Sequence, residues 1–172
     1  MTPELATRLA ALGIDVQTLA ARGLREYAEP AALVDADRNA DGRVFELIAP
    51  AAVAWQQLRA AAAADGVTLF LVSAYRSIQR QHEIVAAKLA RGQLIDDILR
   101  VSAAPGYSEH HTGRAIDIGT PGSPLLEQEF DGTPAYAWLC AHAGQYGFRL
   151  SYPPGNADGY LYEPWHWCWH AD

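Results

Sequence analysis

Two segments of the sequence place imidazole and carboxylate side chains close together. The first contains His110 and, seven residues later, Asp117, and the second contains Glu163 and His166. Imidazole is the commonest side-chain ligand for metals. Two histidines and one aspartate leave the fourth position of a tetrahedral zinc ion open, and a free glutamate nearby can act as the base. One hypothesis is therefore an open zinc site with a glutamate beside it.

A buried histidine can equally be a hydrogen-bonded core residue, and the spacing alone leaves that alternative open. The helical zinc motif is absent at His82, because Ala86 stands where a second histidine is needed, so we interpret His82 as a helix-surface residue. We interpret His111 as part of the pocket wall or as a neighbour of the ligands. No motif surrounds His142 or His170, which we assign to structural roles.

The faces of the predicted strands test whether these side chains can meet. Asp117 lies in a predicted strand over residues 114–118 and must point away from its two isoleucine neighbours, where a carboxylate needs a partner. In a regular strand Glu163 and His166 would point to opposite faces. Pro164 between them cannot continue a strand ladder and predicts a bulge or an edge, which resolves the conflict.

The elements that position these residues follow from periodicity and capping residues. We expect helices over residues 3–12, 15–23, 50–64, 77–91 and 136–146. We expect strands over residues 67–72, 114–118 and 160–169, the first of them central, and a polar loop over residues 35–42. This order predicts an α+β fold with a small, mostly antiparallel sheet flanked by helices and a zinc site on the sheet. We expect a single domain over residues 1–172, with residues 1–49 as an N-terminal helical extension and residues 50–172 as the catalytic core.

Composition limits the class of protein. The 172 residues are 50% apolar and carry a formal net charge of −7, so one core can form, and disordered and fibrous classes are excluded. Lys88 is the single lysine beside twelve arginines, and without a basic stripe we expect no nucleic-acid partner. No apolar run approaches the roughly 20 residues that a membrane span needs. We expect a monomer.

The N-terminus lacks the basic and apolar regions of a secretory signal, so the sequence as written predicts a cytoplasmic location. A periplasmic location is the alternative if a signal sequence has been removed. Cys140 and Cys168 are too few for a disulfide scaffold, and we interpret both as core thiols. A bridge between them stays open, because the sequence cannot supply its geometry.

Three segments together resemble a known family. Residues 105–117 resemble the Ser-x-His-x-x-Gly-x-Ala-x-Asp signature of the VanY-type D-alanyl-D-alanine carboxypeptidases, in the peptidase M15 group. Residues 162–166 resemble the Glu-x-x-His partner of that signature. Residues 73–77, with Gln81, resemble the Ser-Gly-Tyr-Arg-Ser segment. The three occur in the family's order, and the resemblance spans roughly residues 50–170.

The resemblance implies the role of each matching residue. Zinc, one ion per chain, would be bound by His110, Asp117 and His166, with Glu163 as the catalytic base. The substrate's terminal carboxylate and carbonyl would be held by Arg76, Gln81 and Ser108. Two departures stand out: Ala74 replaces the usual glycine, and Trp167-Cys168 stands where many relatives have an aromatic residue followed by arginine.

The activity implied is hydrolysis of the C-terminal D-alanine of peptidoglycan stem peptides or muropeptides. Two alternatives remain. An L,D-carboxypeptidase would act on muropeptide tetrapeptides, which the related family also includes. A zinc-containing peptidoglycan-binding module would bind without turnover, although the presence of Glu163 argues against it.

A second metal is a separate hypothesis. Asp37, Asn39 and Asp41, followed by a glycine, fit the first half of an EF-hand calcium loop. Position twelve of that loop is Ile48 instead of glutamate. The alternative is an ordinary Asp/Asn/Gly turn, which the same residues also favour.

Overall fold

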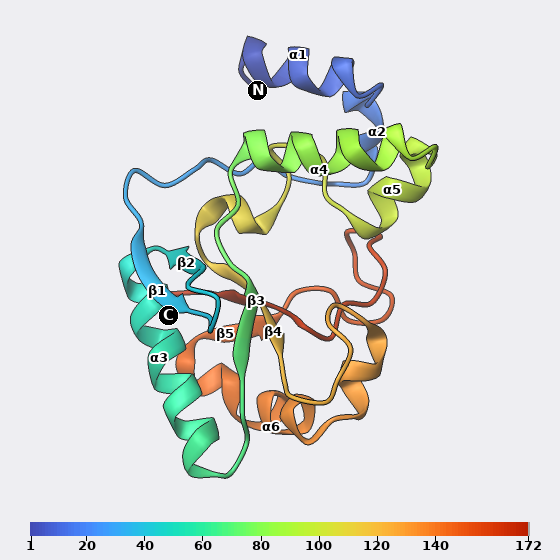
Figure 1. Cartoon of the computed structure of the whole chain (residues 1–172). Helices are drawn as coiled ribbons and strands as arrows, with labels where there is room; N and C mark the ends of the chain where they lie inside the picture. Colours follow the sequence, from blue (N-terminus) through green and yellow to red (C-terminus); the bar gives the residue numbers. More distant parts are fainter. Residues whose placement is uncertain (172) are drawn as a thin grey trace.

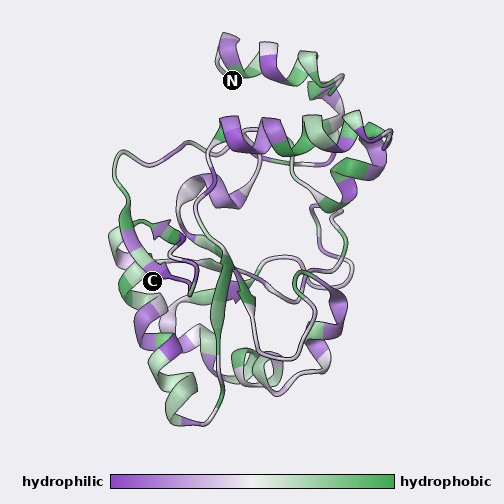
Figure 2. Ribbon diagram, in the orientation of Figure 1, coloured by the Kyte–Doolittle hydropathy of each residue, from purple (hydrophilic) through white to green (hydrophobic). Residues whose placement is uncertain are grey.

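A four-stranded antiparallel sheet lies at the centre of the chain in a computed structural model that describes residues 1–171 (Figure 1). Its strands, in spatial order, are β3 (Phe70–Ser73), β4 (Ala115–Gly119), β6 (His166–Trp169) and β5 (Phe148–Leu150). Strand β4 is buried along its whole length, and β3 is hydrophobic over most of its length (Figure 2). The predicted α+β class with a small antiparallel sheet flanked by helices is confirmed.

The larger hydrophobic core joins this sheet to two helices, α3 (Ala49–Ala64) and α6 (Pro134–His142). A 3-10 turn, η3 (Ala143–Tyr146), follows α6, and another, η2 (Gln128–Gly132), precedes it. Successive side chains of a strand point to opposite faces. Ile116 and Ile118 of β4 therefore enter the core with Trp55 of α3, whereas Asp117 between them points to the other face.

A second hydrophobic cluster forms where the N-terminal helices meet the middle of the chain (Figure 1). Its helices are α1 (Pro3–Ala11), α2 (Val16–Ala21), α4 (Ile78–Ala90) and α5 (Ile95–Val101). Leu9 of α1 packs in this cluster with Val85 of α4 and Ile98 of α5. The side chains of Thr2, Asp15 and Ser77 accept hydrogen bonds from the first turns of α1, α2 and α4, so these helices begin where their capping residues predict.

Residues 34–47 form a hairpin, which corrects the polar loop expected over residues 35–42. Its strands, β1 (Val34–Arg38) and β2 (Val44–Leu47), pair antiparallel and pack against α3. Only one side of the hairpin is apolar: Ala36, Phe45 and Leu47 enter the larger core. The charged residues on the other side gave the segment the composition of a loop.

The calcium hypothesis is not supported, because two of the three candidate ligands, Asp37 and Asn39, have other partners. The Asp37 carboxylate accepts hydrogen bonds from Arg59 Nη1 at 2.6 and 2.7 Å and from Trp55 Nε1 at 2.9 Å. Asn39 Oδ1 accepts one from the Arg43 backbone nitrogen at 2.9 Å, closing the turn of the hairpin. The carboxylate that would open a calcium loop instead ties β1 to α3.

Two strand predictions are also corrected. Strand β3 is at an edge of the sheet and not in its centre, and only Leu71 in it is buried, because a continuous apolar run does not determine the number of paired neighbours. The last strand covers residues 166–169 instead of 160–169. A turn precedes it, in which the His166 backbone nitrogen donates to the Glu163 carbonyl at 3.1 Å, and Pro164 lies inside this turn instead of at a strand bulge.

Gly113 ends the short 3-10 helix η1 (Glu109–Thr112) with a φ of +65° and leads into β4. We expect Gly113→Ala to destabilise the fold beyond the about 1–2 kcal/mol of a left-handed non-glycine residue. The added Cβ would lie 2.9 Å from Leu33 Cδ2 and 3.2 Å from the Ile48 backbone nitrogen. Urea unfolding followed by tryptophan fluorescence measures the loss. The control is Gly122→Ala, at a φ of +83°, where the added Cβ would have no atom of the described residues within 4 Å. Equal losses of unfolding free energy in both variants would show that crowding around Gly113 does not contribute.

Candidate metal centre and active site

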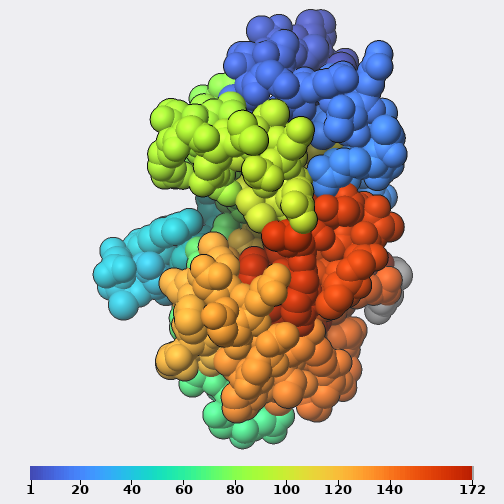
Figure 3. All heavy atoms as spheres, turned by 90° about the vertical axis from the view of Figure 1, so that its right-hand side faces the viewer, coloured from blue at the N-terminus to red at the C-terminus, as the bar shows by residue number. Residues whose placement is uncertain are grey.

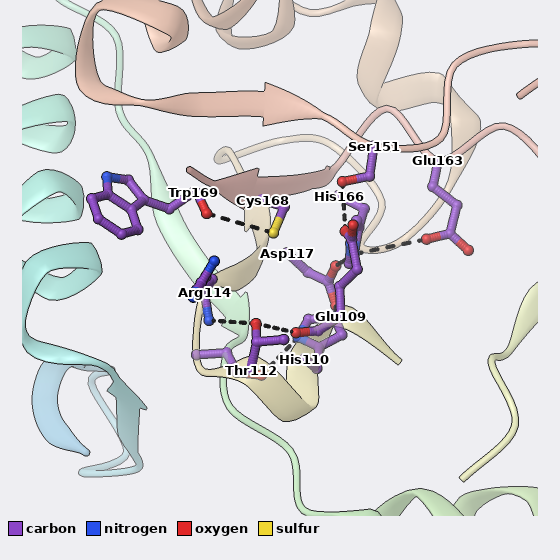
Figure 4. Close-up of polar contacts among 11 residues, drawn as sticks. Glu109, His110, Thr112, Arg114, Asp117, Ser151, Glu163, His166, Cys168 and Trp169 are labelled. Carbon is purple, nitrogen blue, oxygen red and sulfur yellow. Dashed lines mark hydrogen bonds and ion pairs between the residues drawn. The ribbon is translucent and has the colours of Figure 1, made fainter. Parts of the chain in front are cut away.

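Three buried side chains converge on one point on the face of the sheet opposite the larger core (Figure 4). They are His110 from η1, Asp117 from β4 and His166 from β6. Each offers one ligand atom, and these atoms all lie within 4.8 Å of one another. The residues proposed from the sequence as zinc ligands are therefore brought together by three different elements.

Strand register places two of these side chains side by side. Asp117 pairs directly with His166 across β4 and β6, and with Ser73 of β3 on its other side. Residues directly opposite in an antiparallel pair point to the same face, with Cβ atoms about 4.5–5.5 Å apart. The pairing of the strands thus fixes the distance between the carboxylate and the imidazole before any metal is bound.

Hydrogen bonds to the backbone orient the His110 ring. Its Nδ1 lies 2.7 Å from the Ala74 carbonyl, so it acts as the donor, and Nε2 is left facing Asp117 Oδ2 at 3.2 Å. The Arg76 backbone nitrogen donates to the His110 carbonyl at 3.2 Å. The segment after β3 therefore holds η1 in place, and the unprotonated nitrogen of His110 points into the site.

The His166 ring lies between two carboxylates. Its Nδ1 is 3.0 Å from Asp117 Oδ1, and its Nε2 is 3.0 Å from Glu109 Oε2. The same Glu109 oxygen accepts a hydrogen bond from Ser151 Oγ at 2.6 Å, and the Tyr152 ring stacks on the imidazole with centroids 4.7 Å apart. Carboxylates that hold the far nitrogen of a metal-binding histidine fix its ring orientation.

Sequence reasoning missed Glu109, although it lies directly before His110. Its partners His166 and Ser151 are 57 and 42 residues away, so its hydrogen bonds are visible only in the folded chain. The signal that could have found it is a carboxylate inside the same short segment as a candidate ligand. Glu109 contacts His166 from outside the set of metal-binding atoms.

The charges of the site favour a bound cation. Burial opposes the charged form of His166, but hydrogen bonds to Asp117 and Glu109 outweigh it and raise its pKa to about 10. Burial likewise opposes ionisation of Asp117, yet the two imidazoles hold its pKa well below the usual range. A buried carboxylate needs a compensating positive charge. Two imidazoles and one carboxylate are a donor set that zinc prefers, so the residues fit this metal.

Glu163 lies beside the ligands without joining them (Figure 4). It belongs to the turn before β6, and its Oε2 is 4.0 Å from His166 Nδ1. Burial raises the pKa of Glu163 to about 7, while the positive charges of His166 and Arg76 act in the opposite direction. A carboxyl group with a pKa near neutrality can both accept and return a proton at physiological pH.

A cavity of about 700 Å³ opens over the site. Its wall contains every residue that we proposed from the sequence for catalysis, metal binding and substrate binding: Arg76, Gln81, Ser108, His110, Asp117, Glu163 and His166.

The side chains proposed to hold the substrate remain available for a ligand. Arg76 Nη1 donates to Gln81 Oε1 at 2.9 Å. Within residues 1–171, no carboxylate forms an ion pair with Arg76, so its guanidinium has charge available for a ligand. Ser108 does not use its hydroxyl to cap η1.

The other histidines lie outside the ligand set. His111 Nδ1 is 2.6 Å from the Arg76 carbonyl, and its Nε2 accepts a hydrogen bond from the Gly106 nitrogen at 3.0 Å, so the ring is neutral and joins two loops. Burial lowers its pKa to about 4. His142 stacks on Trp138 of α6, with ring centroids 4.7 Å apart. Cys140 and Cys168 are both free thiols, so the possible bridge between them is not formed; Cys168 is buried, as expected of a core thiol, whereas Cys140 is exposed and the core interpretation is wrong for it.

The fold and the open His/Asp/His site define the class of protein, and comparisons define the family. Residues 45–172 match the family described as VanY, D-alanyl-D-alanine carboxypeptidase. A D-alanyl-D-alanine carboxypeptidase of Enterococcus faecalis is 34% identical over 122 residues, covering 65% of this chain and 44% of that relative. The chain belongs to the VanY family, and it spans less than half the length of this curated relative.

Two solved structures share the fold. The LdcB LD-carboxypeptidase is 32% identical with a TM-score of 0.73, over 82% of this chain and 69% of LdcB. The D,D-pentapeptidase VanY from a VanB-type vancomycin resistance cassette, a substituted form in complex with Zn(II), is 30% identical with a TM-score of 0.63. That alignment covers 85% of this chain and 84% of the other.

The position of Glu109 gives a prediction about metal affinity. We expect Glu109→Gln to weaken zinc binding about 10- to 100-fold, because the amide holds the His166 ring without the charge that makes it a stronger ligand. Competition with a zinc chelator measures the affinity. Glu129→Gln is the matched control, since Glu129 is exposed and lines the same cavity. Unchanged zinc affinity in Glu109→Gln would show that the contact does not support the metal.

Proposed function

We propose that the protein is a zinc-dependent carboxypeptidase that removes the C-terminal D-alanine from peptidoglycan-derived peptides. One observation carries this proposal: the buried set of His110, Asp117 and His166 has Glu163 beside it and the guanidinium of Arg76 in the same cavity. The zinc-bound VanY structure supports zinc as the metal. The family description and the Enterococcus faecalis relative support D-alanyl-D-alanine peptides as the substrate.

Each residue has a chemical task in this proposal. Zinc held by the His/Asp/His set would polarise the scissile carbonyl and make water more acidic. Glu163 takes the proton of the attacking water and returns it to the leaving amine. Arg76, fixed by Gln81, binds the terminal carboxylate of the peptide, because a planar guanidinium can hold both oxygens. Ser108 holds the carbonyl of the substrate.

The same reasoning extends to the organisation of the chain. We propose a single domain with residues 1–49 as an N-terminal extension and residues 50–172 as the catalytic core, because the proposed site residues all lie in the second range. A monomer is sufficient, since one chain supplies the whole site. No helix in the described part of the chain has the length and apolar character needed to cross a bilayer.

An L,D-carboxypeptidase acting on tetrapeptides is the second candidate. The similarity to LdcB, with a TM-score of 0.73, favours it. A binding module without turnover is disfavoured by Glu163, since a binding site has no need for a base 4.0 Å from a metal-binding histidine. Incubation of the zinc-loaded protein with muropeptide pentapeptides and tetrapeptides, followed by mass spectrometry, separates these functions. Loss of one alanine from the pentapeptide supports the proposal, and cleavage of neither peptide would refute both enzyme candidates.

Substitutions can distinguish the role of Glu163 as the base from the role of the metal ligands. Glu163→Gln should keep its zinc but lose about 10²- to 10⁴-fold in turnover, because the amide cannot accept the proton. His110→Ala, the companion variant, should lose both zinc and activity. Elemental analysis and a D-alanine release assay measure the two properties. Wild-type turnover by Glu163→Gln would eliminate this mechanism.

Recognition of the free carboxylate gives a second test. Arg76→Lys should lower kcat/KM on free-acid peptides about tenfold to a hundredfold, because an ammonium cannot bind a carboxylate through two parallel hydrogen bonds. The wild type should scarcely cleave a C-terminally amidated peptide. Equal wild-type turnover of the acid and the amide would remove both the role of Arg76 and the carboxypeptidase assignment, and would indicate an endopeptidase.

A further inference from the structure

Lys88, the single lysine of the chain, lies in the wall of the same cavity. It is on the face of α4 that also carries Gln81 and Ile84 into the cavity, and its side chain is half-buried. None of the roles proposed above uses it. A half-buried ammonium without a function is unusual, because its loss of hydration must be balanced by charge or hydrogen bonds.

The surroundings of Lys88 supply hydrogen bonding but no compensating carboxylate. Its Nζ donates to Ser102 Oγ at 2.6 Å. Among residues 1–171, no carboxylate oxygen lies within ion-pair distance of Nζ. Burial lowers the pKa of Lys88, and the positive charges of Arg91 and Arg76 lower it further, while Glu163 raises it. The ammonium of Lys88 is therefore not neutralised by an ion pair within the described residues, although Glu127, Glu129 and Glu163 also line the cavity.

The groups around Lys88 form a pocket wall from separate segments. The backbone nitrogen of Leu161 donates to the Arg100 carbonyl at 2.9 Å, which brings the loop before β6 to the end of α5. Ile84 and Val101 provide apolar surface in this wall. Tyr160 also lines the cavity, but its hydroxyl oxygen is buried, and we assign it no role in the wall around Lys88. In Figure 3 the yellow-green segment of α4 and α5 borders the red C-terminal segment on this side of the molecule.

Helix geometry separates Lys88 from the residues proposed to hold the terminal carboxylate. Lys88 is seven residues after Gln81 in α4, which is about 10 Å along the axis at a rise of about 1.5 Å per residue. An extended peptide advances about 3.3–3.6 Å per residue. A side chain two residues before the terminal residue can therefore reach Lys88 while the C-terminus stays at Arg76.

We propose that Lys88, with the hydroxyl group of Ser102, forms a second anion-binding subsite for a carboxylate on a side chain of the substrate, upstream of its terminal residue. The proposal rests on the proposed function, since it concerns the same cavity. The apolar surface of Ile84 and Val101 accommodates an aliphatic side chain that ends in this carboxylate. A side chain ending in an ammonium group is repelled by Lys88.

Three acetylated tripeptides of the form X-D-Ala-D-Ala test this subsite on the zinc-loaded protein. Residue X is 2-aminoadipate, norleucine or lysine, so the side chain ends in a carboxylate, a methyl group or an ammonium group. We expect the wild type to prefer the aminoadipate peptide over the norleucine peptide by about tenfold to a hundredfold in kcat/KM, and the lysine peptide to be the poorest. Lys88→Met should reduce the first ratio to near one, and Lys88→Arg should retain a preference for the carboxylate.

Arg91→Met is the matched control. Arg91 is exposed at the end of α4 and lies outside the cavity wall, so this substitution removes a nearby positive charge without changing the wall itself. It should retain the wild-type ratio. Equal preference in wild type and Lys88→Met, or an equal loss in Arg91→Met, would overturn the subsite. Calorimetric binding of the aminoadipate and norleucine peptides separates the two proposals. Tighter binding of the aminoadipate peptide without turnover would support the proposed subsite and refute the proposed carboxypeptidase activity. Turnover of both peptides without a preference for the aminoadipate peptide would refute the subsite alone.

Discussion

The carboxylate of Asp117, buried in the middle of an apolar strand, is the constraint on which the rest of the structure depends. Its neighbours Ile116 and Ile118 enter the larger core, so the carboxylate must be compensated on the opposite face. His166 does this from one side at 3.0 Å, and His110 Nε2 faces the carboxylate from the other at 3.2 Å, where a bound cation would complete the compensation. One strand therefore stabilises the fold with two side chains and assembles the metal site with the third.

The helices with capping residues and the candidate site could be predicted from the sequence because their signals are local, whereas α5, which has no side-chain cap, was not expected. Caps such as Ser77 lie next to the turns they stabilise, and His110 and Asp117 share one short segment with the glycine that turns the chain between them. The hairpin over residues 34–47 could not be recognised, because its apolar side is defined by contacts with α3. The contact of Glu109 with His166 likewise depends on residues distant in sequence.

The position of β3 is a second feature that could not be predicted from the sequence. Its apolar residues correctly indicated a strand, yet only Leu71 of β3 is buried, and the place of β3 at the sheet edge depends on which strands remain to pair with it. Edge strands need protection, and the Tyr75 nitrogen, just beyond β3, donates to the Glu46 carbonyl of the hairpin at 3.0 Å. The hairpin and the segment that carries Arg76 are thus joined, so a region outside the proposed catalytic motifs supports the segment proposed to bind substrate.

The charge of the whole chain says little about the charge of its cavity. The formal net charge is −7, and several arginines pair with acidic neighbours at the surface, as Arg80 does with Glu83. Exposed pairs of this kind are screened by water and salt. Arg76 and Lys88 instead line a partly enclosed cavity, where a lower effective dielectric strengthens their attraction for an anion. An acidic protein can therefore bind an anionic peptide, because it is the unpaired charges inside the cavity, and not the total, that meet the ligand.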